Sequence, residues 1–239
     1  MTTSLKTKTI DVVILCGGFG KRLQSLFPEL PKALVDINGR PFLAYLIEHV
    51  KQFGFKRFIL CTGYKGALVK EYFTKRSMGV EIVFSEESEP LGTAGALKHA
   101  EGLLRSSPLL VLNGDSLCTI DLNSFFYFHN QQDGVASLAL TANVDTIEDC
   151  GTVTLDTSGK IMSFEEKKKS RDAKPLANAG VYFLKKEICA EIPAHTQCSL
   201  EYDLFPQIIG QGVYGFKTTE RLIDIGTPPR YRKACELLK

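Results

Sequence analysis

Three glycines and two basic residues follow the first strongly apolar run of the chain. Residues 11–16 read DVVILC, which predicts a buried strand, and the glycine-rich segment 17–20 (GGFG) comes directly after it. Glycines in that place allow backbone amides to approach a phosphate closely. Arg22 and Lys32 would add the positive charge that a triphosphate needs before it can be attacked.

The spacing of this loop argues against two common phosphate motifs. A dinucleotide fingerprint needs Gly or Ala where Leu23 stands, and the GxxxxGK[ST] of a P-loop does not occur. Glycine-rich turns after a first strand also occur in α/β folds for structural reasons alone. The loop therefore favours phosphate or nucleotide binding without choosing the class of protein.

Two aspartates could hold a cation near that phosphate. Asp115 follows the apolar run 109–113, and Asp224 lies in the apolar segment LIDIG near the end of the chain. An aspartate after a strand can simply cap a turn, but a buried, unpaired Asp224 would be costly, so a metal partner makes sense of its setting. Two carboxylates plus substrate phosphates are a typical way of holding Mg²⁺. The chain has no D-x-D, which weighs against metal-dependent glycosyltransferases with a similar sheet.

The elements that must position these residues alternate along the first half of the chain. Repeated βα units predict a mostly parallel sheet with helices on both faces, and ligands bind beyond the carboxyl ends of such strands. The predicted strands are 11–16, 57–62, 81–85 and 109–113, and the predicted helices are 42–53, 67–73 and 93–104.

Strands dominate the second half, where they are expected to extend the sheet with antiparallel or mixed pairing and to cover the far end of the site. They are predicted at 135–141, 151–155, 161–164, 179–184 and 213–218. No linker, repeat or low-complexity tract interrupts the chain. We therefore expect one domain over residues 1–239, with halves at about 10–115 and 116–239.

The composition of the chain limits the class of protein and its expected location. With 239 residues, 44% hydrophobic content and a net charge of +2, the chain can bury one substantial core, and we expect no nucleic-acid partner. It has neither an apolar run of about 18 residues nor a secretory leader, so we expect no membrane partner and a cytoplasmic location. Seven cysteines without a CxxC pair predict reduced thiols. His99 is expected to be structural.

The motifs resemble those of the sugar-1-phosphate nucleotidyltransferases. GGFGKRL followed by LPKALVDINGRPFLAYLI is similar to the family pattern GGxGTRL…PKxLxP, with Lys21 where the family usually has Thr. The resemblance implies a Rossmann-like, three-layer α/β fold of the GT-A-like kind. It also implies that Asp115 and Asp224 are the ligands of a Mg²⁺ cofactor, and that Arg22 and Lys32 are catalytic.

The segment EPLGTAGAL predicts the nucleoside site, because small residues let a base or ribose approach the backbone. In the family, the residue five positions before its first glycine faces the base, and that residue is Glu87. A carboxylate accepts from two adjacent donors, as N1–H and N2–H of guanine present them, so GTP is the preferred donor. The alternative is that Glu87 only solvates the loop. The residues assigned to the nucleotide are Leu15, Gly17, Gly18, Gly20, Lys21, Glu87, Gly92, Thr93, Ala94 and Asn113.

Further motifs resemble the sugar-phosphate side of the family. The motif FEEK implies that Lys167 contacts the phosphate of the sugar 1-phosphate as a third catalytic cation. The motif NAGVYF implies that Asn178 binds sugar hydroxyls, and SLEYD implies that the carboxylate of Glu201 binds a pair of them. CGTV fits a turn at Gly151 where the family tolerates no side chain. The residues assigned to this side are Gly114, Gly151, Glu166, Lys167, Asn178, Gly180 and Glu201.

The resemblance implies in-line attack of a sugar 1-phosphate on GTP, with Arg22 on the triphosphate tail and Lys32 and Lys167 on the reacting phosphates. LCGG, EPLGTAGAL, VLNGD, FEEK and IDIG are most similar to the D-glycero-α-D-manno-heptose 1-phosphate guanylyltransferases, which serve bacterial surface polysaccharides. Three alternatives stay open: mannose or glucose 1-phosphate as acceptor, another nucleotide as donor, and a catalytically silent regulatory subunit. A homo-oligomer is also left open.

Overall fold

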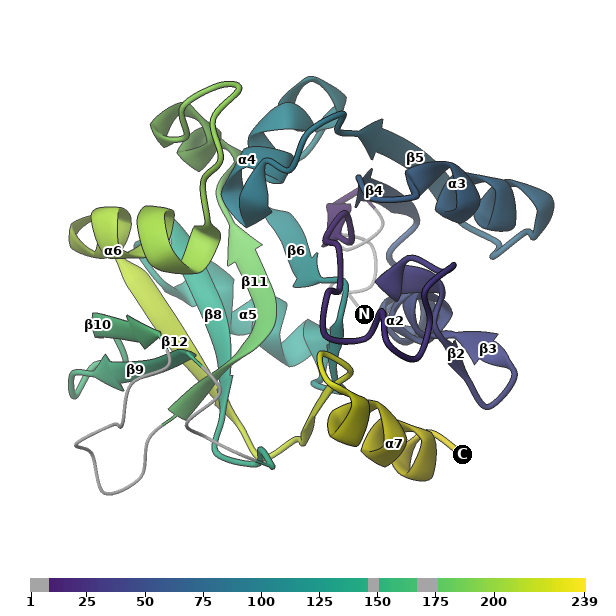
Figure 1. The fold of residues 1–239 in the computed structure, drawn as a ribbon. Coiled ribbons are helices and arrows are strands. Elements are labelled where there is room, and N and C mark those ends of the chain that lie inside the picture. Colours follow the sequence, from purple (N-terminus) through teal and green to yellow (C-terminus); the bar gives the residue numbers. More distant parts are fainter. Residues whose placement is uncertain (1–8, 146–150, 167–175) are drawn as a thin grey trace.

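The computed structural model describes residues 9–145, 151–166 and 176–239, with only the backbone of residues 165 and 166. Lys167, Cys150 and the side chain of Glu166 therefore lie outside the described residues. One sheet of nine strands runs through the chain, in the order β10-β9-β11-β6-β1-β4-β5, with β8 beside β11 and β12 beside β8 (Figure 1). No helix among these residues is long and apolar enough to cross a membrane.

The first half forms the parallel part of the sheet, as predicted. Its strands are β1 (Asp11–Leu15), β4 (Arg57–Thr62), β5 (Glu81–Glu86) and β6 (Leu109–Asn113). Its helices are α2 (Phe42–Gln52), α3 (Gly66–Lys75) and α4 (Gly92–His99). The predicted third helix was too long, because α4 ends at His99 and a separate 3-10 turn, Glu101–Leu103, follows.

The second half adds mixed strands, again as predicted. The strand β11 (Leu176–Leu184) runs antiparallel to β6 and to β8 (Ala136–Thr141), and β12 (Val213–Thr218) runs parallel to β8. At the edge, β9 (Gly151–Leu155) pairs with β11 and with β10 (Ile161–Glu166). The long strand β11 therefore joins the two halves of the sheet.

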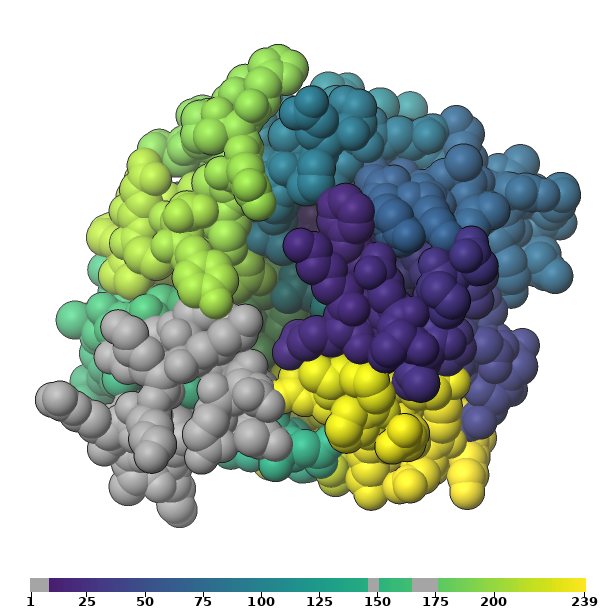
Figure 2. Space-filling view, in the orientation of Figure 1, coloured from purple at the N-terminus to yellow at the C-terminus, as the bar shows by residue number. Residues whose placement is uncertain are grey.

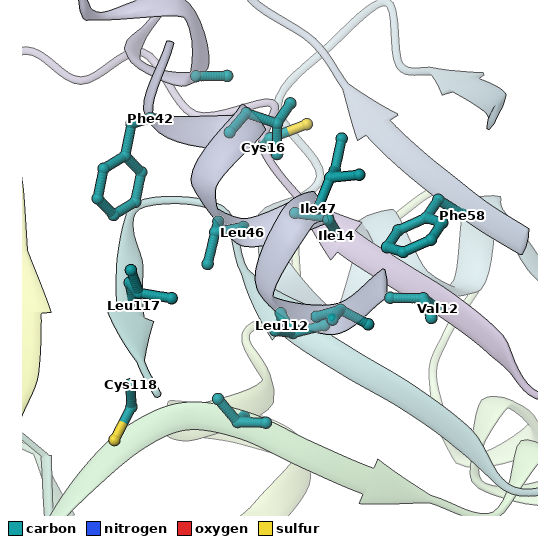
Figure 3. Packing of buried hydrophobic residues seen from close by; sticks show 14 of the residues in the cluster. Val12, Ile14, Cys16, Phe42, Leu46, Ile47, Phe58, Leu112, Leu117 and Cys118 are labelled. Carbon is teal, nitrogen blue, oxygen red and sulfur yellow. The ribbon is translucent and has the colours of Figure 1, made fainter. Parts of the chain in front are cut away.

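Alternation along the strands gives each face of the sheet its own core. On β1, Val12 and Ile14 pack with Leu46 and Ile47 of α2 (Figure 3). Val13 packs on the other face with Leu97 of α4. All six side chains are fully buried. Helices thus cover both faces, which confirms the predicted three layers.

Several elements of the structure were not predicted from the sequence. The two-stranded ribbon of β7 and β13 matters most for the site, because it pairs Asp224 with Ser116 and places Asp115 beside it. The elements not predicted are β2 (Asp36–Ile37), β3 (Arg40–Pro41), β7 (Ser116–Cys118), α5 (Leu122–Gln131), α6 (Phe205–Ile208), β13 (Leu222–Asp224) and α7 (Pro228–Leu237). Short 3-10 turns at Lys32–Leu34, Lys186–Glu191 and Ile209–Gln211 and a π-helical turn at Leu200–Leu204 complete the chain.

The buried His129 should make folding stability depend on pH. Its Nδ1 lies 2.9 Å from Ser137 Oγ, and its ring stacks on Phe183. Burial, assisted by the charge of Lys185, lowers the pKa of His129 to about 4. Between pH 6.5 and 4 the unfolded chain therefore binds a proton that the folded chain does not, so stability is complete above pH 6.5 and falls as the pH decreases.

We expect His129 to cost about 2 kcal/mol of unfolding free energy between pH 6.5 and pH 5. The unfolding free energy of His129→Leu, measured with urea at both pH values, should fall by about 2 kcal/mol less than that of the wild type. This expectation holds whatever the variant's stability at neutral pH. His99→Leu is the matched control, because His99 is exposed, and it should keep the wild-type pH dependence. An unchanged pH dependence in His129→Leu would contradict the assignment.

Candidate functional site

Two adjoining clefts open beyond the carboxyl ends of the parallel strands, and Gly92, Thr93, Asn113 and Asp115 line both. The face is hollowed between the N-terminal loop, coloured purple, and the light-green segment near residue 200 (Figure 2). The first cleft holds about 270 Å³ and is also lined by Leu15, Cys16, Gly17, Gly18, Phe19, Lys32, Ala33, Glu87, Pro90, Ala96, Gly114 and Gln197. The second holds about 450 Å³ and is also lined by Arg22, Ser116, Gly151, Asn178, Gly180, Ser199, Glu201, Tyr202, Leu222, Asp224 and Arg230.

The glycines after β1 shape the first cleft in different ways. A side chain on Gly17 would place its first carbon 2.8 Å from Glu87 Oε1, whereas one on Gly18 would meet nothing within 4 Å. Gly20 has φ +60° and lies against Lys32. Gly17 therefore makes room for Glu87, Gly18 leaves open space at the cleft wall, and Gly20 turns the loop around Lys32.

The Lys32 ammonium is fixed between the two clefts. The 3-10 turn that begins with Lys32 follows Pro31, and Lys32 Nζ lies 2.6 Å from Asp115 Oδ2. Burial alone would raise the pKa of Asp115, but Lys32, with a smaller contribution from Arg22, holds this pKa below its usual value. The carboxylate is therefore ionised at neutral pH, as a metal ligand must be.

Asp224 reaches the same place from the other strand of the ribbon. Ile225 N donates to Asp115 O at 3.1 Å, so the two aspartates meet where β7 and β13 pair. The expectation that Asp224 is buried and unpaired was wrong. Its side chain is 30% exposed, it accepts from Gly226 N, and Arg230 Nη1 lies 3.5 Å from its Oδ1. The apolar neighbours in the sequence turn inward, whereas Asp224 lines the second cleft.

The residues around Gly226 form a compact group of opposite charges. A first side-chain carbon on Gly226 would lie 2.8 Å from Asp224 Oδ1, 3.2 Å from Arg22 Nη2 and 3.4 Å from Lys32 Nζ. No group of three or more His, Cys, Asp and Glu that could hold a metal was found among the described residues. Two cleft-lining carboxylates instead suit a cation that takes few ligands from protein and completes its shell with water and phosphate, as Mg²⁺ does.

A hydrogen-bond network fixes the polar wall of the second cleft. The buried Tyr182 donates to Glu201 Oε1 at 3.1 Å and accepts from Asn178 Nδ2 at 2.8 Å. Asn113 Nδ2 lies 3.3 Å from Glu201 Oε1, and Thr93 Oγ1 donates to Glu201 Oε2 at 2.8 Å. Glu201, Asn178 and Asn113 therefore present fixed polar groups to a ligand, and Thr93 serves to hold Glu201.

Glu87 has a different environment, at the end of the first cleft that faces Gly17. Its backbone N–H donates to Thr62 O at 2.9 Å, which places it beyond β5. Within the described residues its Oε2 is buried and has no hydrogen-bond partner. Burial raises the pKa of Glu87, although a hydrogen bond from Leu91 and the charge of His99 oppose the shift. A buried acceptor of this kind is costly unless a ligand donates to it.

A family model described as nucleotidyl transferase matches residues 11–239, which is nearly the whole chain. The chain belongs to the nucleotidyl transferase family.

Relatives of this nucleotidyltransferase share most of its length. It is 36% identical over 231 residues to the D-glycero-α-D-manno-heptose 1-phosphate guanylyltransferase of Aneurinibacillus thermoaerophilus, covering 96% of the chain and 99% of that protein. It is 31% identical over 240 residues to the mannose-1-phosphate guanylyltransferase of Mycobacterium tuberculosis, and this match covers 98% of the chain and 66% of that protein. The crystal structure of HddC from Yersinia pseudotuberculosis complexed with GMP-PN matches with a TM-score of 0.83 and 35% identity, over 96% of this chain and 100% of that one.

These matches confirm the family resemblance drawn from the motifs and the Rossmann-like fold. Nucleotidyltransferases of this family generally use a divalent metal, which agrees with the cleft-lining carboxylates of Asp115 and Asp224.

Most of the residues assigned from the sequence line one of the two clefts. The exceptions in the nucleotide group are Gly20, which supports Lys32, the exposed Lys21, and Ala94, whose backbone N–H donates to Cys198 O at 2.9 Å. His99, with Nε2 3.2 Å from Glu86 O, lines neither cleft. Six cysteines are free thiols, as predicted, and the seventh, Cys150, lies outside the described residues.

The structure of this nucleotidyltransferase also adds residues that the sequence reasoning did not select. Tyr182 lies four positions after Asn178 on the same strand, so its alternation with Asn178 was a usable signal. Arg230 follows Asp224 by six residues in the chain, and a basic residue so close to a candidate metal ligand could have been noticed. No sequence pattern marked the remaining cleft-lining residues as functional; these are Phe19, Gln197, Ser199 and Tyr202.

Proposed function

We propose that this nucleotidyltransferase transfers GMP from GTP to D-glycero-α-D-manno-heptose 1-phosphate, giving a GDP-sugar and pyrophosphate. The observation that carries the choice of base is Glu87, a carboxylate at the end of the first cleft whose buried Oε2 has no hydrogen-bond partner among the described residues. Guanine would satisfy it with two adjacent N–H groups. The relatives named as guanylyltransferases and the structure containing GMP-PN support the same donor.

In this proposal the two clefts hold the two substrates in line. An oxygen of the sugar phosphate attacks the α-phosphorus of GTP, the new P–O bond forms, and the bond to the β-phosphate oxygen breaks as pyrophosphate leaves with the electron pair. Lys32 stands where the clefts meet and would contact the α-phosphate, while Arg22 would hold the triphosphate tail. Most of the rate gain would come from positioning and charge, since no covalent enzyme intermediate is required.

The carboxylates and the polar wall complete the assignment. Asp115 and Asp224 would hold Mg²⁺, which when bound would neutralise charge developing on the transferred phosphoryl group. Asn178 and Glu201 would receive sugar hydroxyls, and Gly151 and Gly180 in the second cleft and Gly114 in the first would lie in the wall around the substrate. Lys167 is proposed as a further cation on the sugar phosphate, and Glu166 as its neighbour on that side.

Pyrophosphate release, measured with four nucleoside triphosphates and a panel of sugar 1-phosphates, tests this function. We expect the highest kcat/KM with GTP and the heptose 1-phosphate. Equal or better turnover of mannose 1-phosphate would favour the second candidate, a mannose-1-phosphate guanylyltransferase, to which the mycobacterial relative points. Turnover with no pair would leave a silent sugar-nucleotide-binding protein.

Replacing Glu87 by Gln should weaken GTP use selectively. A hydrogen bond to a charged group contributes about 1.5–3 kcal/mol, so we expect kcat/KM for GTP to fall by about tenfold to a hundredfold. Inosine triphosphate keeps N1–H and lacks the N2 amino group, so the preference of the wild type for GTP over ITP should largely disappear in the variant.

Glu89→Gln is the matched control, because Glu89 lies exposed in the same loop and lines neither cleft. It should keep both the GTP rate and the discrimination against ITP. If Glu87→Gln also kept both, Glu87 would not read the base.

A further inference from the structure

The described lining of the second cleft holds more carboxylates than cationic side chains. Among the described residues that line it, three are carboxylates, Asp115, Glu201 and Asp224, and two are arginines, Arg22 and Arg230. A sugar 1-phosphate brings up to two further negative charges into this cleft. With Arg22 assigned to the triphosphate, Arg230 is the remaining cation of the described lining.

The fold holds Arg230 firmly in that wall. It lies on α7, below the N-terminal loop in Figure 1, where the next residue, Tyr231, donates to Asp36 O at 3.0 Å and packs edge-on against Phe27. At the other end of the helix, Asn38 Nδ2 donates to Cys235 O at 2.8 Å. A guanidinium on so well anchored a helix loses little freedom when it binds a ligand.

The surroundings of Arg230 also suit a phosphate. Its side chain is 15% exposed, and its Nη1 lies 3.5 Å from Asp224 Oδ1. Partial burial strengthens the attraction of a guanidinium for an anion, and its planar set of N–H groups matches two phosphate oxygens.

We propose that Arg230 binds the phosphate of the sugar 1-phosphate, next to the metal ligand Asp224. This inference rests on the proposed function for the identity of the acceptor. The proposal makes Arg230 a substrate-binding residue. The alternative is that Arg230 only orients the side chain of Asp224.

The test compares Arg230→Gln with Arg232→Gln, a matched control on the same helix, because Arg232 is exposed and lines neither cleft. In Arg230→Gln the KM for the sugar 1-phosphate should rise tenfold to a hundredfold, while the KM for GTP and the Mg²⁺ concentration at half-maximal rate stay within about twofold. Arg230→Lys should fall between wild type and Arg230→Gln, because it keeps the charge and loses the planar pair of donors.

A change in Mg²⁺ dependence with an unaltered KM for the sugar 1-phosphate would overturn the proposal, since Arg230 would then act only on Asp224. Unchanged kinetics would overturn it as well. Calorimetric titration of mannose 1-phosphate into the protein in EDTA provides a readout without turnover, and weaker binding to Arg230→Gln than to Arg232→Gln supports the proposal. If wild type binds this ligand through Arg230 but releases no pyrophosphate with any substrate pair, the proposed reaction fails and the role of Arg230 stands.

Discussion

Asp115→Asn should lower kcat by about a thousandfold and leave the fold intact. The substitution removes one of two carboxylates between the clefts and leaves the Lys32 ammonium, 2.6 Å away in the wild type, without its counter-charge. Loss of one group that stabilises the transition state costs up to a factor of about 10³, and weaker binding at the proposed metal site would add to that. Pyrophosphate release at saturating substrates measures the effect.

Asp133→Asn provides the control for Asp115→Asn, since Asp133 is exposed and lines neither cleft. It should retain wild-type turnover. Circular dichroism and urea unfolding should show both variants folded. Direct titration with Mn²⁺, followed by electron paramagnetic resonance, should show weaker metal binding in Asp115→Asn alone. A variant that binds metal and turns over normally would remove Asp115 from the metal site and the mechanism.

Arg22→Ala should reduce kcat/KM by about thirtyfold to a thousandfold. This range corresponds to about 2–4 kcal/mol of transition-state stabilisation for one well-placed cationic donor. Arg22 lines the second cleft, and its Nη2 lies near the Gly226 turn together with Lys32 Nζ. Its loss therefore removes charge from the point where both substrates would meet, and its exposed position means that the fold should tolerate the change.

Two further variants separate charge from geometry at Arg22. Arg22→Lys should recover only part of the activity, because an ammonium cannot contact two phosphate oxygens as a planar guanidinium does. Arg76→Ala removes an arginine directly after α3, which lines neither cleft and whose guanidinium lies 4.2 Å from the ring centre of Tyr72. Arg76→Ala should keep full activity, and similar losses in Arg22→Ala and Arg76→Ala would point to a general effect of charge.

The sequence predicted the parallel strands well because they are continuous apolar runs. The strands β4 and β6 have the predicted bounds, and both faces of each are buried. The helix α5 was missed because its aromatic run at residues 125–128 obscures the 3.6-residue pattern. The ribbon of β7 and β13 was missed because three-residue strands carry no period.

The site was predictable where a motif fixes the chemistry and unpredictable where only the fold brings residues together. Asp115, Lys32 and Glu87 were selected from their motifs and do line the first cleft. Arg230 was not selected, because its nearness to Asp224 depends on how α7 follows the ribbon. The same dependence explains the error about Asp224, whose apolar neighbours said nothing about the direction of its own side chain.

The strand β11 has a consequence for the integrity of the chain. It pairs with β6 of the first half along Val181–Leu184 and with β8 and β9 of the second half. A fragment ending near residue 115 would leave the outer edge of β6 without a partner, an edge whose residues are almost entirely apolar and buried in the intact chain. Unpaired edges of this kind invite pairing between molecules. Each half of the sheet thus covers a strand edge of the other half that would otherwise be open to aggregation. The strand β11, which makes this pairing, also bears Asn178 and Tyr182.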